Sequence, residues 1–448
     1  MPKHADPIRT ELIRPPTRPK TKQATTRRKV AGPLKAFVGP RTLAQALDQA
    51  VSPQRRQEIA EQSGYDTQAQ KLTFAPYLRA LLVRQIEGGS LHDLQAGMAR
   101  DPLYQAHGAQ LEISVPGLSK VNAQRSPQPF WDVLAEVMAA VDALPQTVRI
   151  GRGKPLGAAT PKELREIGQL LERTQIFDGT TVELPPQLAQ WARTSTKQER
   201  AGIKVQLRLR AGSGGMDRVM VTGGKGNDNP YFRALLDLET AAPGQVYLFD
   251  TGYCKLATYD AIRKHGSELV TILHESITVE IVEERVVATP ETAQGYTIHS
   301  DRIVYLGTGK TRSRYCWRLL DATDTQGQRR TIVTSLLDES AERITQLRAY
   351  RWTIEIVFRW LKRVLQLDTL ISYSPGGIAM QVAVALITYG LLLLYHAGGA
   401  LSVKALQRRV KRALHEALFA AGVAEGERRA RERRARRDAG LPLLREAG

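Results

Sequence analysis

The spacing of apolar residues predicts a helical first part of the chain. Apolar residues recur there every three or four positions, most clearly from Leu78 to Ile86 and from Phe130 to Met138. This spacing is typical of amphipathic helices. Gly88-Gly89-Ser90 and Val115-Pro116-Gly117 are expected to interrupt them. The sequence therefore predicts a compact helical domain over residues 41–150.

Beyond the Gly- and Pro-rich stretch from Gly151 to Pro161, the pattern changes from helical to strand-like. Residues Ile203 to Arg210 alternate strictly, which predicts a strand with one face on a core and the other in water. Val246 to Phe249 form a continuous apolar run that ends at Asp250, as expected of a buried strand that stops at a site. Up to Leu273 the predicted order is three strands, helix, strand, helix, strand.

Three further regions complete the pattern. Short alternating runs dominate from Thr278 to Ser335 and predict an inserted all-strand subdomain. A helix that Asp338 can cap follows and continues to about Leu365. The apolar run from Ile378 to Tyr395 contains polar residues and falls short of a typical membrane-spanning length, so a buried core helix is favoured over a membrane span.

The charge balance indicates a polyanionic partner. Lys and Arg outnumber Asp and Glu by 64 to 45, which gives a formal net charge of +19 and a pI near 10.0. Such an excess is typical of proteins that bind nucleic acid or carry a basic tail. Arg9 to Lys35 predict a flexible basic arm. The Arg-rich segment from Lys404 onward is either a solvated charged end, which is favoured, or a DNA contact.

Cysteine usage and the N-terminal residues favour a reducing compartment. Cys254 and Cys316 are too few for a disulfide framework or a Cys-rich zinc site. The N-terminal residues contain no apolar stretch that could serve as a signal sequence. A cytoplasmic location is therefore expected.

Two aspartates are candidates for chemistry. Asp250 stands at the end of a predicted central strand, where an unpaired buried charge is costly and a divalent cation would offset that cost. The alternative is that Asp250 caps the helix that follows. Asp178 lies in the strand-like segment Gln175 to Leu184, beside the small Gly179. Alone it is weak evidence, since a single Asp there is more often a strand-end or turn residue.

The long predicted helix carries a third acid. Ile354 and Phe358 belong to its apolar stripe, and Glu355 lies at the margin of that stripe. Arg351 and Arg359 stand one turn away on either side, so the simplest interpretation is a set of helical ion pairs. That interpretation does not explain Arg351, which occupies a stripe position. A cation kept near a core usually has an anionic partner.

The residues around the third acid resemble the DDE transposases of bacterial insertion sequences, specifically the insertion-sequence-four family. The family's signature is Tyr, two residues, Arg, three residues, Glu, six residues, Lys. Arg351, Glu355 and Lys362 fit that spacing, and Arg348 stands where the family has Tyr. The resemblance covers roughly Phe74 to Leu394.

Two shorter motifs carry the same resemblance. They are Asp178-Gly179-Thr180 and Asp250-Thr251-Gly252-Tyr253, in which Thr251 replaces the Arg of the family's usual Asp-Arg-Gly-Tyr. The resemblance implies an RNase H-like core with Asp178 and Asp250 on adjacent strands and Glu355 on a helix. Glu355 lies 105 positions after Asp250, which is too many for one crossover, and the strand-rich insertion accounts for the excess.

The fold class implied is α/β: an RNase H-like core, in which helices flank a mixed sheet, is interrupted by an all-β insertion and preceded by a helical domain. The expected domains are a basic arm (1–40), a helical DNA-binding domain (41–150), the first part of the core (165–277), the β insertion (278–336), the second part of the core (337–400) and a basic tail (401–448).

The resemblance also implies a site and a reaction. Asp178, Asp250 and Glu355 are the implied catalytic and metal-binding residues, with two Mg²⁺ ions, or Mn²⁺, as cofactors about 4 Å apart. The implied reaction is hydrolytic nicking at the element's ends, followed by attack of the freed 3'-hydroxyl on target DNA. The implied DNA-binding residues are Arg351, Lys362, Tyr253 and Arg359.

The implied partner is double-stranded DNA, at both the element's terminal repeats and the target, bound by a homodimer, with no membrane involved. Two alternatives stay open from the sequence. One is a transposase-derived DNA-binding protein that has lost catalysis. The other is a structure-specific nuclease on the same RNase H-like core, which would cut DNA without joining it.

Overall fold

A computed structural model describes residues 43–396, with gaps at 68, 70–71, 101–112, 145–160, 188–189, 193–199, 224–228, 288–289, 293–295, 325–326 and 364. The predicted basic arm, the Gly- and Pro-rich stretch before Pro161 and the basic tail lie outside the described residues.

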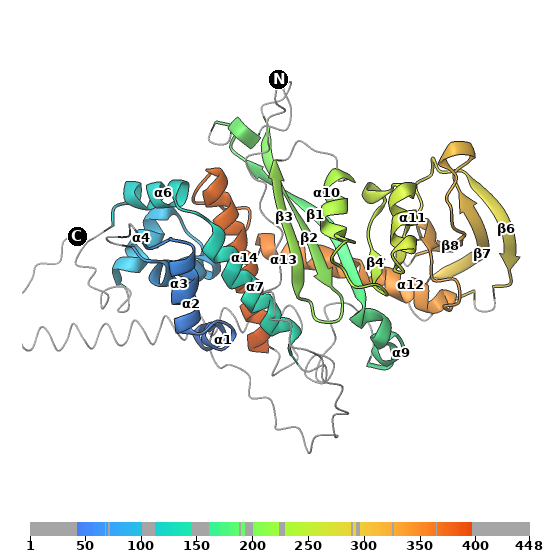
Figure 1. The fold of residues 1–448 in the computed structure, drawn as a ribbon, viewed down its shortest axis with the longest axis horizontal. Helices are drawn as coiled ribbons and strands as arrows, with labels where there is room; N and C mark the ends of the chain where they lie inside the picture. Colours follow the sequence, from blue (N-terminus) through green and yellow to red (C-terminus); the bar gives the residue numbers. More distant parts are fainter. Residues whose placement is uncertain are drawn as a thin grey trace, which may run out of the picture. The chain divides into compact units, whose positions relative to one another are not determined.

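A nine-stranded mixed sheet runs through the described chain in the order β3-β2-β1-β4-β5-β9-β8-β7-β6 (Figure 1). Strands β1, β4 and β5 are parallel, and all other neighbouring strands are antiparallel. The strands are β1 (Thr174–Leu184), β2 (Ala201–Arg210), β3 (Met216–Gly223), β4 (Val246–Leu248), β5 (Glu268–Ile272), β6 (Val279–Arg285), β7 (Thr297–Leu306), β8 (Trp317–Thr323) and β9 (Arg329–Thr334).

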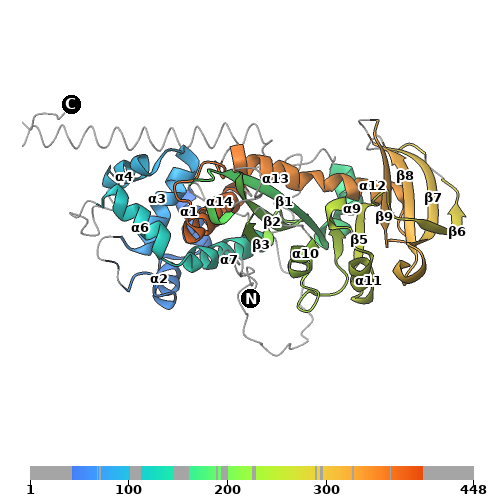
Figure 2. The same cartoon turned by 90° about the horizontal axis from the view of Figure 1, so that it is seen from above.

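Helices cover both faces of this sheet. Figure 2 shows α9, α12 and α13 along one face and α10 and α11 along the other. The bounds are α9 (Pro161–Glu172), α10 (Asn229–Leu236), α11 (Leu256–Lys264), α12 (Ala341–Tyr350) and α13 (Trp352–Arg363), with short 3₁₀ turns η1 (Gln190–Ala192), η2 (Thr251–Tyr253) and η3 (Gly309–Thr311). The predicted order of three strands, helix, strand, helix, strand is confirmed from β1 to β5.

The two faces of β1 have different neighbours. Phe177 is fully buried and packs edge-on against Phe232 of α10, with ring centroids 5.3 Å apart. Successive side chains of a strand point to opposite faces. Asp178 therefore points away from this aromatic core, toward the face that α12 and α13 cover.

The prediction that one side of β2 faces water is wrong, because both faces of the strand are buried. Gln206 and Arg208, on the polar side, are buried like their apolar neighbours. Arg208 donates to both carboxylate oxygens of Asp217 at 2.7 Å and to the carbonyl oxygens of Leu235 and Leu236 at the end of α10. A buried cation with four acceptors replaces the solvent that the alternation led us to expect.

The helices of the first part of the chain pack around the last described helix, α14 (Pro375–His396). Those in contact with it are α1 (Leu43–Ala50), α3 (Phe74–Glu87), α6 (Val115–Gln124) and α7 (Gln128–Asp142), while α2 (Pro53–Gln62) and α4 (Leu91–Arg100) pack on these helices. Contact between α7 and α14 is close at Gly390, where a Cβ atom would lie 2.6 Å from Val137 Cγ1. Glycine is thus required for this approach of the two helices.

Helix α14 is long and apolar enough to cross a membrane by length and composition, and it is the one such helix in the described residues. Its most apolar stretch is 94% buried inside the protein. The prediction of a buried core helix is confirmed, although the helix is longer than the apolar run suggested.

One of the two predicted helix breaks is present. Gly88 and Gly89 separate α3 from α4, and both have positive φ angles. Val115-Pro116-Gly117, in contrast, begins α6, because the hydroxyl of Ser114 accepts a hydrogen bond from the amide of Gly117 at 3.3 Å. Proline in a first helical turn removes only an N–H that has no intrahelical partner.

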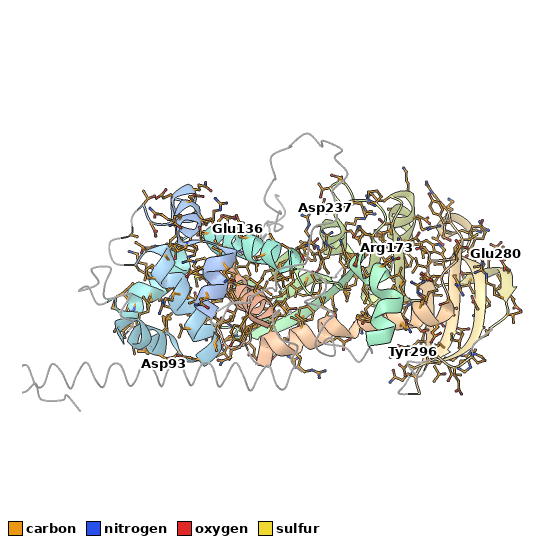
Figure 3. All side chains as sticks on the ribbon, turned by 90° about the horizontal axis from the view of Figure 1, so that it is seen from below. Asp93, Glu136, Arg173, Asp237, Glu280 and Tyr296 are labelled. Atoms are coloured by element: carbon orange, nitrogen blue, oxygen red, sulfur yellow. The ribbon has the colours of Figure 1, made fainter. Side chains whose placement is uncertain are left out.

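Strands β6 to β9 continue the same sheet, since β9 pairs with β5 over Val270↔Thr334 to Ile272↔Ile332. The segment predicted as an inserted subdomain is therefore hydrogen-bonded directly to the strands of the core. Its outer strand β6, which carries Glu280 (Figure 3), is exposed along nearly its whole length.

Residues of β6 to β8 also hold the segment that enters α12. Arg318 of β8 forms a buried two-point ion pair with Asp301 of β7, at 2.9 and 2.6 Å. Its other nitrogen donates to the carbonyl oxygens of Leu337 and Glu339. Arg285 of β6 donates to the carbonyl oxygen of Leu337 as well, at 2.7 Å.

The long helix predicted from Asp338 to about Leu365 is two helices, α12 and α13, separated at Arg351. Its cap is also different. The hydroxyl of Ser340, and not Asp338, accepts the hydrogen bond from the amide of Arg343. The break at Arg351 becomes important for the site described next.

Candidate active site

Strand register brings Asp178 and Asp250 to the same edge of the sheet. Ile176 of β1 pairs with Leu248 of the adjacent parallel strand β4. Each aspartate lies two residues beyond its member of this pair. Because side chains alternate with a period of two, both carboxylates project toward the face that carries α12 and α13.

Asp178 is the more buried of these aspartates, with 21% of its side chain exposed. Its carboxylate accepts a hydrogen bond from the amide of Gly179 at 2.8 Å. A Cβ atom on Gly179 would lie 3.2 Å from Gln206 Cγ and 3.6 Å from the hydroxyl of Tyr253. The small residue after the acid thus allows β2 and the η2 turn to approach the strand closely.

Asp250 departs from the burial that the sequence predicted. Strand β4 ends at Leu248, and 44% of the Asp250 side chain is exposed. Its carboxylate accepts from the amide of Thr251 at 2.9 Å, so it caps the η2 turn. Capping and a role in the site are therefore compatible for Asp250, since one carboxylate oxygen can cap the η2 turn while the other faces the site.

Glu355 joins the two aspartates through Arg351. The guanidinium of Arg351 lies 3.5 Å from Asp178 Oδ2 and 3.9 Å from Asp250 Oδ2, and it donates to Glu355 Oε1 one turn along α13. Three carboxylates from β1, the end of β4 and α13 therefore converge on one cation. The three acids are thus the anionic partners expected for Arg351, which stands among the apolar positions of the predicted helix.

Arg348 is a further residue of the site that the sequence did not assign to it. Its guanidinium lies 3.9 Å from Asp250 Oδ1 with only 13% of the side chain exposed. Burial, and next the positive charge of Arg351, lower the pKa of Arg348 to about 10. The signal was its spacing, since Arg348 stands seven residues before Glu355 along the predicted helix edge.

The remaining predicted DNA-binding residues lie in different surroundings. Lys362 donates from Nζ to the carbonyl oxygen of Thr181 on β1 at 2.7 Å, and Arg359 is exposed on α13. Tyr253 is 2% exposed, and its ring lies 4.8 Å from that of Phe232. The ring of Tyr253 therefore packs in the core, so a direct DNA contact would require the η2 turn to open.

Burial raises the pKa of Asp178 to about 6; its amide hydrogen bond and Arg351 act in the opposite direction. The negative charges of Asp250 and Glu355 raise it further. The ionised form of Asp178 is therefore stabilised by a cation nearby.

We expect the free energy of unfolding of the metal-free protein to fall as the pH rises from about 4 to about 6. Asp178 binds its proton more tightly in the folded chain than in the unfolded chain, so its contribution to stability is lost as it ionises. Urea unfolding in a chelator at several pH values measures this. Asp178→Asn should flatten the slope in this window, and identical slopes for both proteins would contradict the assignment.

The donor chemistry of the cluster suits a hard divalent cation. All three acids offer carboxylate oxygens, which Mg²⁺ and Mn²⁺ prefer, and the partial exposure of Asp250 leaves access for phosphate and water. Among the described residues, no three Asp, Glu, His or Cys side chains already form a group spaced to hold a metal ion. The guanidinium of Arg351 lies among the three acids instead.

Comparisons with known proteins agree with one another. A family model described as the transposase DDE domain matches residues 169–391, which include Asp178, Asp250 and Glu355. The probable transposase for insertion sequence element IS5377 of Geobacillus stearothermophilus is 24% identical over 355 residues, 78% of this chain and 84% of that protein. The putative transposase y4zB of Sinorhizobium fredii is 25% identical over 238 residues, 53% of this chain and 64% of that protein.

Among solved structures, the cryo-EM structure of the piggyBac transposase synaptic complex with hairpin DNA is similar to this chain with a TM-score of 0.40 and 10% identity. The match covers 91% of this chain and 87% of that one.

Proposed function

The chain belongs to the DDE transposases of bacterial insertion sequences, DNA-cleaving enzymes of transposition that use divalent metal ions, and from this premise we propose its particular reaction. The protein binds the terminal inverted repeats of its element, cleaves DNA strands there and joins the freed 3' ends to target DNA. The core that carries this chemistry is RNase H-like, with β6 to β9 as its insertion.

The observation that supports this proposal is the convergence of Asp178, Asp250 and Glu355 on the Arg351 guanidinium. These acids come from positions 178, 250 and 355, and a folded sheet edge brings them together. An ordinary surface ion pair joins two side chains and does not gather three acids from distant parts of the chain around one cation. A cluster of three carboxylates at one edge suits phosphodiester cleavage.

Asp178, Asp250 and Glu355 are the proposed ligands of Mg²⁺, with Mn²⁺ as a substitute and two ions as the expected number. When bound, these ions supply the activation of the attacking water or 3'-hydroxyl and the stabilisation of the leaving oxygen. The amides of Gly179 and Thr251 fix the carboxylates of Asp178 and Asp250, so these two acids are oriented before DNA arrives.

Arg351, Lys362 and Arg359 are the proposed phosphate contacts beside the acids. Charge-assisted bonds from such side chains position a strand and carry little sequence information. Tyr253 contributes by holding the η2 turn against Gly179. Recognition of the repeats is assigned to the helices before residue 150, and two copies of the chain act in the DNA complex.

The decisive experiment uses a DNA duplex that carries the inverted repeats read from the sequence flanking the gene. We expect Mg²⁺-dependent cleavage at the repeat ends and then joined products with a second duplex. Asp250→Asn, which keeps the size of the side chain, is the matched control. Binding without cleavage would leave a DNA-binding protein without catalysis, and cleavage without joining would leave a nuclease.

We expect DNA affinity to fall steeply with salt. Each phosphate neutralised by Lys or Arg releases a counterion, and about six such contacts would cost roughly a thousandfold in affinity between 50 and 200 mM salt. The chain's net charge of +19 makes a large number of contacts reasonable. Fluorescence anisotropy over a salt series measures the slope; an affinity that barely responds to salt would contradict the proposed phosphate contacts.

A further inference from the structure

Arg351 holds the place of a counter-ion in the acid cluster. Its guanidinium is within 4 Å of Asp178 and Asp250 and donates to Glu355, while only 13% of its side chain is exposed. Its Nε atom has no hydrogen-bond acceptor among the described residues. The three acids therefore do not use all five N–H groups of Arg351, and the free groups suit a further acceptor.

The position of Arg351 in the chain allows its side chain to change partners. It is the residue between α12 and α13, and its amide donates to the carbonyl oxygen of Arg348 at 3.1 Å, in the last turn of α12. A different rotamer of the Arg351 side chain changes no backbone hydrogen bond, so both helices stay intact when its guanidinium turns toward another partner.

The charges of the site determine whether a divalent cation and Arg351 can both lie beside the three acids. In the described site three carboxylates face two guanidinium groups, those of Arg351 and Arg348. A divalent cation bound to the acids would lie against Arg351, and like charges a few ångströms apart repel strongly where solvent is partly excluded. A DNA phosphate removes this conflict, because it attracts both the cation and the planar guanidinium, which binds phosphate through two parallel hydrogen bonds.

We propose that Arg351 is the exchangeable counter-ion of the acid cluster, and that DNA binding draws it away and so admits the divalent cations. The inference rests on the proposed function, because it assumes that these acids are the metal ligands. It makes metal loading dependent on substrate: DNA arrives first, and the free protein binds the metal weakly.

Manganese binding to the full-length protein tests this order. Mn²⁺ is titrated and followed by electron paramagnetic resonance, with and without the repeat-bearing duplex. Linkage requires DNA to raise Mn²⁺ affinity by the same factor by which Mn²⁺ raises DNA affinity, and we expect a factor of roughly ten or more. In Arg351→Gln without DNA, we expect Mn²⁺ to bind at least about tenfold more tightly than in the unaltered protein.

Two further variants separate the possible explanations. Arg343→Gln removes one positive charge from α12 at an ion pair with Glu339, so it controls for a general change in charge and should leave Mn²⁺ affinity unchanged. Arg351→Lys retains the charge without the planar fork and should fall between the glutamine variant and the unaltered protein. Circular dichroism of each variant checks that it is folded.

Each outcome has a defined meaning. Equal or weaker Mn²⁺ binding by folded Arg351→Gln without DNA, or an affinity that DNA does not change in the unaltered protein, overturns the exchange but leaves the metal site standing. Absence of Mn²⁺ binding in every protein, with DNA present, overturns the proposed metal ligands together with the exchange. Tight binding by Arg351→Gln and DNA-dependent binding by the unaltered protein support it.

Discussion

Replacing Asp178, Asp250 or Glu355 by Ala should lower the rate of strand cleavage by at least about a thousandfold and leave DNA affinity, compared in a chelator without divalent metal, within a few fold of normal. The acids are the proposed metal ligands, and loss of one from a group that acts as a unit removes most of its effect. The proposed DNA contacts belong to other side chains. Cleavage and binding are measured on the same repeat-bearing duplex.

The same variants carry an internal control for folding. Each removes one of three like charges that crowd around Arg351, so none should lower the thermal midpoint appreciably. Glu183→Ala, at an exposed position on the same strand as Asp178, should cleave normally. A variant that keeps cleavage would remove its residue from the catalytic set, while one that loses DNA binding would point to a structural role.

Arg318→Met should lower the free energy of unfolding by about 3 to 5 kcal/mol. It leaves the carboxylate of Asp301 buried without its partner, and breaking one side of a buried ion pair costs about this much. It also removes the donors to the carbonyl oxygens of Leu337 and Glu339 at the start of α12. Cleavage should therefore fall as well, since Arg348 lies on that helix and Arg351 directly follows it.

Two comparisons distinguish this effect from ordinary surface electrostatics. Arg312→Met breaks the exposed pair with Glu280 and should change stability little. The double variant Arg318→Met with Asp301→Leu removes both buried charges and should regain much of the lost stability. If stability returned and cleavage did not, the bonds to the α12 entrance would be the part that matters for the site. If Arg318→Met lost no more stability than Arg312→Met, the proposed stabilising role of the buried Arg318–Asp301 pair would be contradicted.

How much of the site was predictable depends on the kind of contact. The strand-like segment around Asp178 and the apolar run before Asp250 are local patterns, and with the family resemblance they placed two acids on adjacent strands and the third on a helix. The break at Arg351 was not predictable in the same way. Residues 341–363 have a continuous helical pattern, and Arg351, the residue between α12 and α13, keeps helical dihedral angles (φ −54°, ψ −33°), so no local pattern marks the break.

Long-range pairing explains the other differences. Short alternating runs predicted strands in residues 278–336 correctly, but their attachment to the core depends on the pairing of β9 with β5, which no local pattern encodes. The buried polar side of β2 has the same origin. Its Arg208 is covered because Asp217 and the end of α10 reach it in the folded chain.

The packing of α14 against α1, α3, α6 and α7 has a consequence for how the protein is made. About 230 residues separate the end of α7 from the start of α14, so on the ribosome the early helices emerge roughly ten to fifty seconds before the helix that completes their core. Until then the apolar face of α7 that contacts Gly390 lacks its cover. Synthesis that stops early, as from a gene copy interrupted before codon 375, would release a chain whose first helices expose apolar surface to chaperones and proteases. Stable packing of the helices between Leu43 and Asp142 thus requires synthesis to continue through the last described helix.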